Sequence, residues 1–273
     1  MNNYIQINIQ TASEEQSELL IALLSQEGYD GFEEKENNVS AFIDEQSYDE
    51  ELLKQILAPF SISYQKEIIA PKNWNAEWER NYEPVIVDDF VAVIAHFHEP
   101  IKNVMHEIVI TPKMSFGTGH HATTWQMMKL MQGFDFVNKT VFDFGSGTGV
   151  LAILADKMGA TSVLALDYDD LCIENSTENI LNNKCKIITV VKREAPPSNQ
   201  QFNIILANIN RHILLQNMQA MSTALTTDGY LFVSGFYVEE NPLLINAAKE
   251  QGLQLIKTSE RHNWSSLIFQ KQN

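Results

Sequence analysis

The chain has 273 residues, with 35 acidic against 19 basic side chains and a formal net charge of −16 at pH 7. Its hydrophobic content of 44% is ordinary for a packed globular protein and excludes disorder of the whole chain. The charge argues against a protein that grips nucleic acid phosphates, because that binding needs a cationic surface. It fits a basic protein partner, or solubility alone.

The first 70 residues predict a small α+β domain. Residues 4–9 alternate apolar and polar side chains, which indicates a half-buried strand. Ser13, with Gln16 three positions later, predicts a capped helix that ends at Gly28. A hairpin over residues 31–44, a helix over 47–60 and a strand over 61–70 follow. The order β-α-β-β-α-β is that of ferredoxin-like domains.

This first segment holds much of the negative charge. Residues 1–70 contain 14 of the 35 acidic residues but only 3 of the 19 basic ones. A small domain has much surface to keep solvated, so solubility is one explanation. A docking face for a cationic protein is the other.

Residues 71–90 are expected to link this domain to the rest of the chain. Trp74 and Trp78 would share one face of a short helix and pack against a domain. Two strands are expected within residues 91–112, the first over 91–97. His96 and His98 would then point the same way, but no third ligand lies nearby, so we predict no metal site.

From residue 140 onward, short apolar runs alternate with segments that have helical periodicity. This alternation predicts a doubly wound, mostly parallel sheet, and the last two runs could add an antiparallel hairpin. We therefore expect three segments: a ferredoxin-like domain (1–70), a linker (71–90) and an α/β domain (91–273). The strands are expected within residues 140–145, 162–167, 186–191, 203–208, 230–235, 254–260 and 265–271.

A glycine-rich loop is the strongest single motif. The run from Asp143 to Gly149, DFGSGTG, follows a predicted strand and opens a predicted helix. Glycines allow a tight turn and a close approach of a ligand to the backbone. Asp167 ends the next strand, where a carboxylate can accept hydrogen bonds from the ribose hydroxyls of a nucleoside cofactor. A strand-helix turn without a ligand is the weaker alternative.

The spacing of the glycines selects the cofactor. A dinucleotide fingerprint, G-x-G-x-x-G, would need glycine where Val150 stands. The form D-x-G-x-G-x-G instead resembles motif I of class I S-adenosylmethionine-dependent methyltransferases. The acidic pair Asp167 and Asp169 resembles their second motif, and Asn208 stands where these enzymes border the methyl-transfer site.

Further segments resemble the bacterial PrmA family, the methyltransferases of large-subunit ribosomal protein eleven. Residues 115–124, SFGTGHHATT, resemble its signature loop, and residues 73–85 resemble its linker with paired tryptophans. Residues 207–209 resemble its A-N-I segment, and the first domain matches its substrate-recognition domain. Ser146 replaces a frequent cysteine, and residues 210–212 are more polar than is usual for the family.

The resemblance implies a Rossmann-like class I fold and assigns site residues. Asn208 would be catalytic and would also contact S-adenosylmethionine. The signature loop, with Thr118 and Gly119, would close over the cofactor. The residues implied to bind it are Thr124, Gly145, Asp167, Asn208, Asp143, Phe116, Gly117 and Gly147.

His120 and His121 could be a general base or metal ligands. We favour a role in starting a helix over residues 120–132, because the implied chemistry needs no metal. On that helix, Met127, Met128 and Met131 have helical spacing and are expected in the core.

The implied reaction transfers methyl groups to lysine side-chain and N-terminal amines of the ribosomal protein, with no direct nucleic acid contact. The alternatives are a methyltransferase of RNA, DNA adenine or a small molecule, a nicotinamide-dependent dehydrogenase, and a non-catalytic binding module. No stretch is long and apolar enough to span a membrane, and the first residues predict no secretory signal. Cys172 and Cys185 fit a reducing compartment, so we expect a cytoplasmic protein. The oligomeric state stays open.

Overall fold

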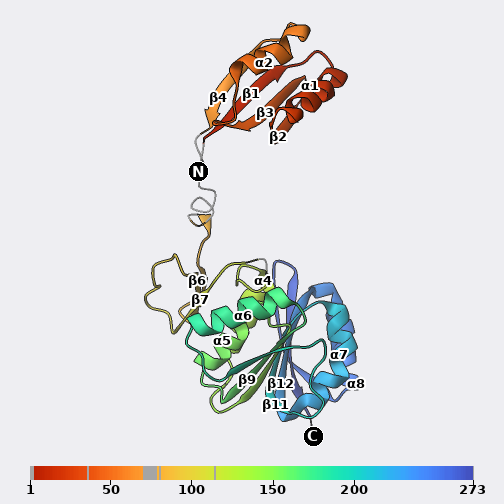
Figure 1. Cartoon of the computed structure of the whole chain (residues 1–273). Coiled ribbons are helices and arrows are strands. Elements are labelled where there is room, and N and C mark those ends of the chain that lie inside the picture. Colours follow the sequence, from red (N-terminus) through yellow and green to blue (C-terminus); the bar gives the residue numbers. More distant parts are fainter. Residues whose placement is uncertain (1–2, 36, 70–78, 80, 114, 273) are drawn as a thin grey trace. The chain divides into compact units, whose positions relative to one another are not determined.

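The computed structural model describes residues 3–35, 37–69, 79, 81–113 and 115–272. The chain divides into two compact units, Met1–Asn81 and Tyr82–Asn273 (Figure 1). Trp74 and Trp78 lie outside the described residues. Within the described part, no helix is long and apolar enough to cross a membrane.

The first unit is a four-stranded antiparallel sheet in the order β2-β3-β1-β4 with two helices, which confirms the ferredoxin-like prediction. The Ser13 side chain accepts a hydrogen bond from the backbone N–H of Gln16, so the predicted cap forms. Ile7 and Leu20 belong to its buried core. The elements are β1 (Tyr4–Gln10), α1 (Glu14–Gln26), β2 (Gly31–Lys35), β3 (Asn38–Asp44), α2 (Glu50–Leu57) and β4 (Tyr64–Ile69).

The second unit is built on a seven-stranded sheet in the order β10-β9-β8-β11-β12-β14-β13. The first five strands of this order run parallel, and β14 and β13 add the antiparallel hairpin that the sequence predicted. The strands are β8 (Thr140–Phe144), β9 (Ser162–Asp167), β10 (Ile188–Lys192), β11 (Phe202–Asn208), β12 (Leu225–Tyr237), β13 (Leu253–Arg261) and β14 (Trp264–Lys271).

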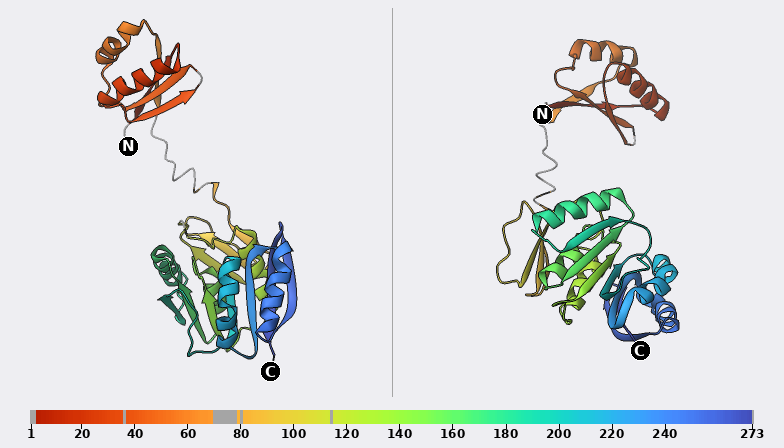
Figure 2. Two further views of the ribbon diagram at one scale, coloured as in Figure 1. Left: turned by 90° about the vertical axis from the view of Figure 1, so that its right-hand side faces the viewer. Right: turned by 60° about the horizontal axis from the view of Figure 1, so that its bottom comes forward.

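Helices cover both faces of this sheet, as a doubly wound fold requires (Figures 1 and 2). One apolar core joins the sheet to α4, α5 and α6, and the three methionines predicted for the core, among them Met127, are buried there. A second core joins the other face to α7 and α8. The helices are α4 (Ala122–Met131), α5 (Val150–Lys157), α6 (Asp170–Asn182), α7 (Arg211–Ala224) and α8 (Asn241–Glu250).

A three-stranded sheet of β5 (Val85–Val87), β6 (Val91–Ala95) and β7 (His106–Ile110) packs on the first of these cores. The sequence did not predict β5 or α8. The prediction that the first strand reaches residue 97 is wrong, because β6 ends at Ala95. His98 instead accepts a hydrogen bond from the Ala95 N–H at Nδ1 and donates from Nε2 to the Tyr82 carbonyl.

The strand order places a topological switch point beside β8. This strand pairs with β9 on one side and with β11 on the other, so the connections after β8 and β11 leave in opposite directions. In open α/β sheets, ligands bind at such a point, beyond the carboxyl ends of the strands. The glycine loop follows β8, Asp167 ends β9 and Asn208 ends β11, so three predicted site segments meet there.

Candidate active site

The glycine loop turns sharply from β8 into α5. The backbone N–H groups of Gly145 and Ser146 both donate to the Leu166 carbonyl at the end of β9, at 2.8 and 3.0 Å. The Gly147 N–H donates to the Asp167 carboxylate at 2.9 Å. These bonds fold the loop back on β9.

Two glycines of this loop have no room for a side chain. Gly145 has a φ of 74°, and a Cβ there would lie 2.2 Å from Ile209 Cγ2. Gly147 has a φ of 54°, and a Cβ there would lie 2.2 Å from the Phe116 carbonyl oxygen. Both φ values lie in the left-handed region that favours glycine. The motif is therefore required by close packing between segments far apart in the sequence.

Asp167 is buried, with 6% of its surface exposed, and its carboxylate is mostly committed to the protein. Oδ1 accepts from the backbone N–H groups of Tyr168 and Asp169, and Oδ2 accepts from Gly147. A carboxylate has about four lone-pair sites. One site on Oδ2 is left, enough for one ribose hydroxyl, and a second hydroxyl would have to displace the Gly147 N–H.

Asp143 is more deeply buried, with 1% of its surface exposed, and accepts a hydrogen bond from the Ala152 N–H in α5. Burial raises the pKa of Asp143 to about 7, and the charge of Asp167 adds to this shift. Its described contact fixes the start of α5, so its cofactor-binding role stays a prediction.

The Asp143 shift predicts a pH dependence of stability. The pKa of Asp143 is raised to about 7 in the folded protein, whereas an aspartate in the unfolded chain has a pKa of about 3.9. The protonated Asp143 therefore contributes stability that is fully present below about pH 3.9 and is lost as the pH rises through about 7. The difference in melting temperature between the wild type and Asp143→Asn should therefore shift by roughly 5 °C or more against the wild type between pH 5 and pH 8. Scanning calorimetry would measure this difference. A pH-independent difference would contradict it.

The signature loop lies against the glycine loop. The Phe116 carbonyl accepts from the Thr148 N–H at 3.0 Å, and the Gly117 carbonyl accepts from the Thr148 hydroxyl at 2.7 Å. The Phe116 ring itself is 51% exposed. Sequence reasoning did not single out Thr148, although its place between two motif glycines was visible.

The histidine pair after this loop has structural contacts. His121 is the N-cap of α4, and its Nδ1 accepts from the Thr123 N–H, which confirms the helix-start interpretation. His120 accepts from the Thr118 hydroxyl at Nδ1 and donates from Nε2 to the Glu83 carbonyl. The Thr123 hydroxyl also lies 2.8 Å from His121 Nδ1, so Thr123 contacts this ring nitrogen through both its backbone and its side chain.

Asn208 has one side-chain atom committed and one available. Its Nδ2 donates to Thr124 Oγ1 at 3.1 Å, and both residues are buried. Asn208 Oδ1 and Ser146 Oγ are buried atoms with no hydrogen-bond partner among the described residues. Buried polar atoms normally have partners. Two orphaned atoms at the carboxyl ends of β11 and β8 therefore fit a site that receives a polar ligand.

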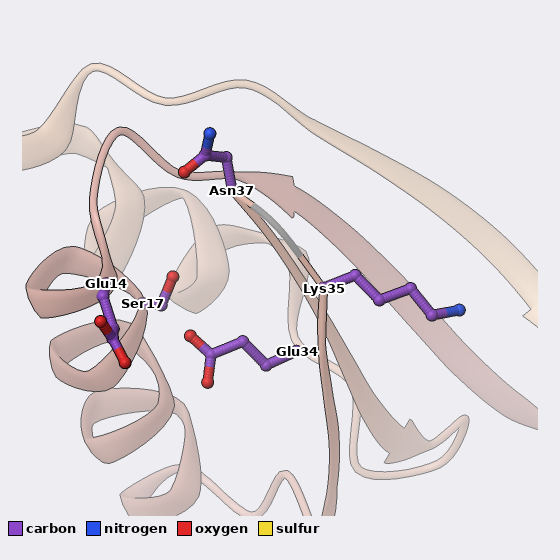
Figure 3. Close-up of a pocket in the computed structure, with 5 residues that line it drawn as sticks. All are labelled: Glu14, Ser17, Glu34, Lys35 and Asn37. Carbon is purple, nitrogen blue, oxygen red and sulfur yellow. The ribbon is translucent and has the colours of Figure 1, made fainter.

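The first unit has a separate acidic hollow of about 410 Å³. Figure 3 shows the Glu34 carboxylate directed toward the helix that carries Glu14 and Ser17, while the Lys35 ammonium points away. Asn37 completes the lining. The described contacts identify no ligand here, but two carboxylates make the hollow suitable for a basic side chain.

Comparison with known proteins settles the family. The model of the family described as ribosomal protein L11 methyltransferase (PrmA) matches residues 3–272. The chain belongs to the PrmA family. A relative from Porphyromonas gingivalis with that name is 41% identical over 92% of this chain and 90% of its own. A second relative with that name, from Phocaeicola vulgatus, is 35% identical, and the match covers 97% of this chain and 98% of the relative.

A solved PrmA-type structure agrees. The crystal structure of ribosomal protein L11 methylase from Lactobacillus delbrueckii subsp. bulgaricus has a TM-score of 0.66 and 28% identity, and the match covers 70% of this chain and 100% of that one. Family and fold together disfavour the dehydrogenase and the other methyltransferase classes considered above. Which PrmA residues of this chain bind the cofactor stays a prediction.

Proposed function

We propose that this PrmA protein transfers methyl groups from S-adenosylmethionine to lysine side-chain and N-terminal amines of ribosomal protein L11. The observation that carries the proposal is the buried Asn208, held by Thr124 with Oδ1 unpartnered, beside a glycine loop that has no room for side chains. Relatives that match over nearly the whole chain are named ribosomal protein L11 methyltransferase.

The residues at the switch point fit S-adenosylmethionine. Asp167 Oδ2 has one acceptor site left for a ribose hydroxyl, and the orphaned Ser146 hydroxyl can donate a hydrogen bond. Thr124 lies in the first turn of α4, where backbone N–H groups favour a carboxylate. When bound, the cofactor would supply a methyl group on a positively charged sulfur, and the sulfur–carbon bond would break as the nitrogen–carbon bond forms.

The protein acts on the amine mainly by positioning and desolvation. A lysine amine has an ordinary pKa of about 10.4 and must give up a proton to solvent water before it can react. A buried pocket favours the neutral amine. Asn208 Oδ1 can accept an N–H hydrogen bond and so aim the nitrogen lone pair. His121 is a poor general base, because protonation of Nδ1 would end its cap of α4.

A direct assay tests the function. The protein is incubated with labelled S-adenosylmethionine and ribosomal proteins from unmethylated cells, and mass spectrometry identifies the labelled protein. We expect L11 to carry the label on amines. Label on RNA or on a small molecule, with L11 unlabelled, would refute the proposal.

Electrostatic docking through the first unit is a second prediction. Neutralising the hollow in the double variant Glu14→Gln/Glu34→Gln should weaken L11 binding by about 3–10-fold at low salt and flatten its salt dependence, since basic partners are attracted by surface acids. Calorimetry at low and high salt would measure both. The control Glu250→Gln/Glu260→Gln removes two exposed acids from the other unit. Equal effects of the two double variants would refute specific docking.

We further propose that the protein works in the cytoplasm. Both cysteines, Cys172 and Cys185, are free thiols in the structure, which fits a reducing compartment. The proposed substrate is a ribosomal protein, and ribosomal proteins are made and assembled there.

A further inference from the structure

Four aromatic rings form a continuous series at the active-site edge of the second unit. The ring centroids of Phe116 and His121 lie 5.2 Å apart, those of His121 and Trp264 lie 4.6 Å apart, and those of Trp264 and Tyr237 lie 4.3 Å apart. Phe116 is 51% exposed and Tyr237 is 42% exposed, so the series borders solvent. These rings, called the aromatic wall below, come from three separate segments of the chain.

Strand register and α4 connect the aromatic wall to Asn208. Asn208 pairs with Ser234 of β12, and Tyr237 follows three residues later on the same strand, past an irregularity between Ser234 and Phe236. Tyr237 in turn pairs with Trp264, the first residue of β14. His121, which lies between Phe116 and Trp264 in the wall, caps the helix whose Thr124 bonds Asn208.

The wall is held in place from several sides. His262 and Asn263 have φ values of 50° and 65°, the geometry of a tight two-residue hairpin turn that presents Trp264. The buried Gln126 of α4 donates from Nε2 to the Trp264 carbonyl at 3.0 Å. Glu240 accepts from the Tyr237 N–H and pairs with Arg211 at the start of α7.

We propose that the aromatic wall binds the amine-bearing side chain of the protein substrate and retains it after methylation. This inference rests on the proposed function. The methylene stem of a lysine packs on ring faces, and its cationic end is attracted by them. Each added methyl group removes an N–H that Asn208 Oδ1 could accept from, but leaves the cation–π attraction in place. The rings therefore hold a methylated amine where hydrogen bonding alone releases it.

The choice of a lysine-like occupant follows from the surroundings. Phe116 and Tyr237, the two ends of the wall, are exposed to solvent, and His121 within it caps the helix whose Thr124 holds Asn208, so the wall offers an entering amine a route toward Asn208. Nδ1 of His121 accepts the Thr123 N–H, and burial lowers the pKa of the ring; both favour the uncharged imidazole, which does not repel an incoming cation. Glu240 offsets the charge of Arg211, the cation at the start of α7, by pairing with it.

The test compares Trp264→Leu and Tyr237→Leu with the conservative Trp264→Phe. L11 is methylated to equal total turnover, and intact mass spectrometry gives the ratio of multiply to singly methylated amines. We expect both leucine variants to lower this ratio by at least about 5-fold and to raise KM for L11, with S-adenosylmethionine affinity by calorimetry unchanged. Trp264→Phe should keep most of the wild-type ratio.

A matched control removes a ring from the same strand away from the site. Tyr230 lies in the middle of β12, seven residues before Tyr237, and packs on Phe134, so Tyr230→Leu should leave the ratio and KM unchanged. A wild-type ratio and KM in both Trp264→Leu and Tyr237→Leu would overturn the proposal. If the wild type adds only one methyl group to each amine, the ratio cannot be measured, and a wild-type KM for L11 in both leucine variants overturns the proposal. Failure of the wild type to label L11 would instead refute the proposed function.

Discussion

Asn208→Ala is expected to lower the rate of methyl transfer by about 10²–10³-fold while the protein stays folded, the effect typical of losing one placed hydrogen-bonding group. The substitution removes the orphaned Oδ1 that would aim the amine, and it removes the donor to Thr124. The cavity left is small, and Thr124 can keep its helical position through α4. Single-turnover kinetics with saturating cofactor and L11 would isolate the chemical step.

Asn210→Ala is the matched control for this experiment. Asn210 is exposed, stands two residues after Asn208, and as N-cap of α7 makes no side-chain cap hydrogen bond. Its loss should leave the single-turnover rate within about two-fold of wild type, because it changes no described contact of the site. Near-normal turnover in Asn208→Ala would show that Asn208 does not position the amine.

The elements with local signals were predictable from the sequence. Ser13 and Gln16 marked the start of α1, and alternating apolar residues marked β1, because capping and burial act over a few residues. The β-α alternation after residue 140 gave the doubly wound sheet for the same reason. By contrast, β5 has only three residues and forms through its pairing with β6, so no local pattern announced it.

The site was only partly predictable, because its contacts join segments distant in sequence. The motif reasoning placed Gly147 in a ligand loop, but the nearest obstacle to a side chain there is the Phe116 carbonyl, 31 residues earlier. Trp264 reaches the site through a hairpin turn and the register of β14 on β12. Pairing register across a sheet is set by the whole fold, so a sequence pattern does not reveal which tail residue arrives beside Asn208.

Asp167→Ala is expected to weaken S-adenosylmethionine binding by at least about 10²-fold and also to lower stability by about 2–4 kcal/mol. The binding loss combines the missing ribose acceptor with a loosened glycine loop, since Asp167 Oδ2 holds the Gly147 N–H. The stability loss arises because the buried N–H group of Gly147 and the partly buried N–H groups of Tyr168 and Asp169 are left without their acceptor. Calorimetric titration and chemical unfolding would measure the two effects separately.

Asp169→Ala separates the two contributions. Asp169 is a neighbouring acid whose side chain caps α6 by accepting from the Leu171 N–H, so its loss should cost about 1 kcal/mol of stability and leave cofactor affinity nearly unchanged. A loss of negative charge alone would weaken binding in both variants alike. An unchanged dissociation constant for S-adenosylmethionine in Asp167→Ala would refute the ribose assignment. Weaker binding in Asp167→Ala alone would instead show that binding depends on the Asp167 carboxylate, which holds the glycine loop and keeps one acceptor site for the ligand.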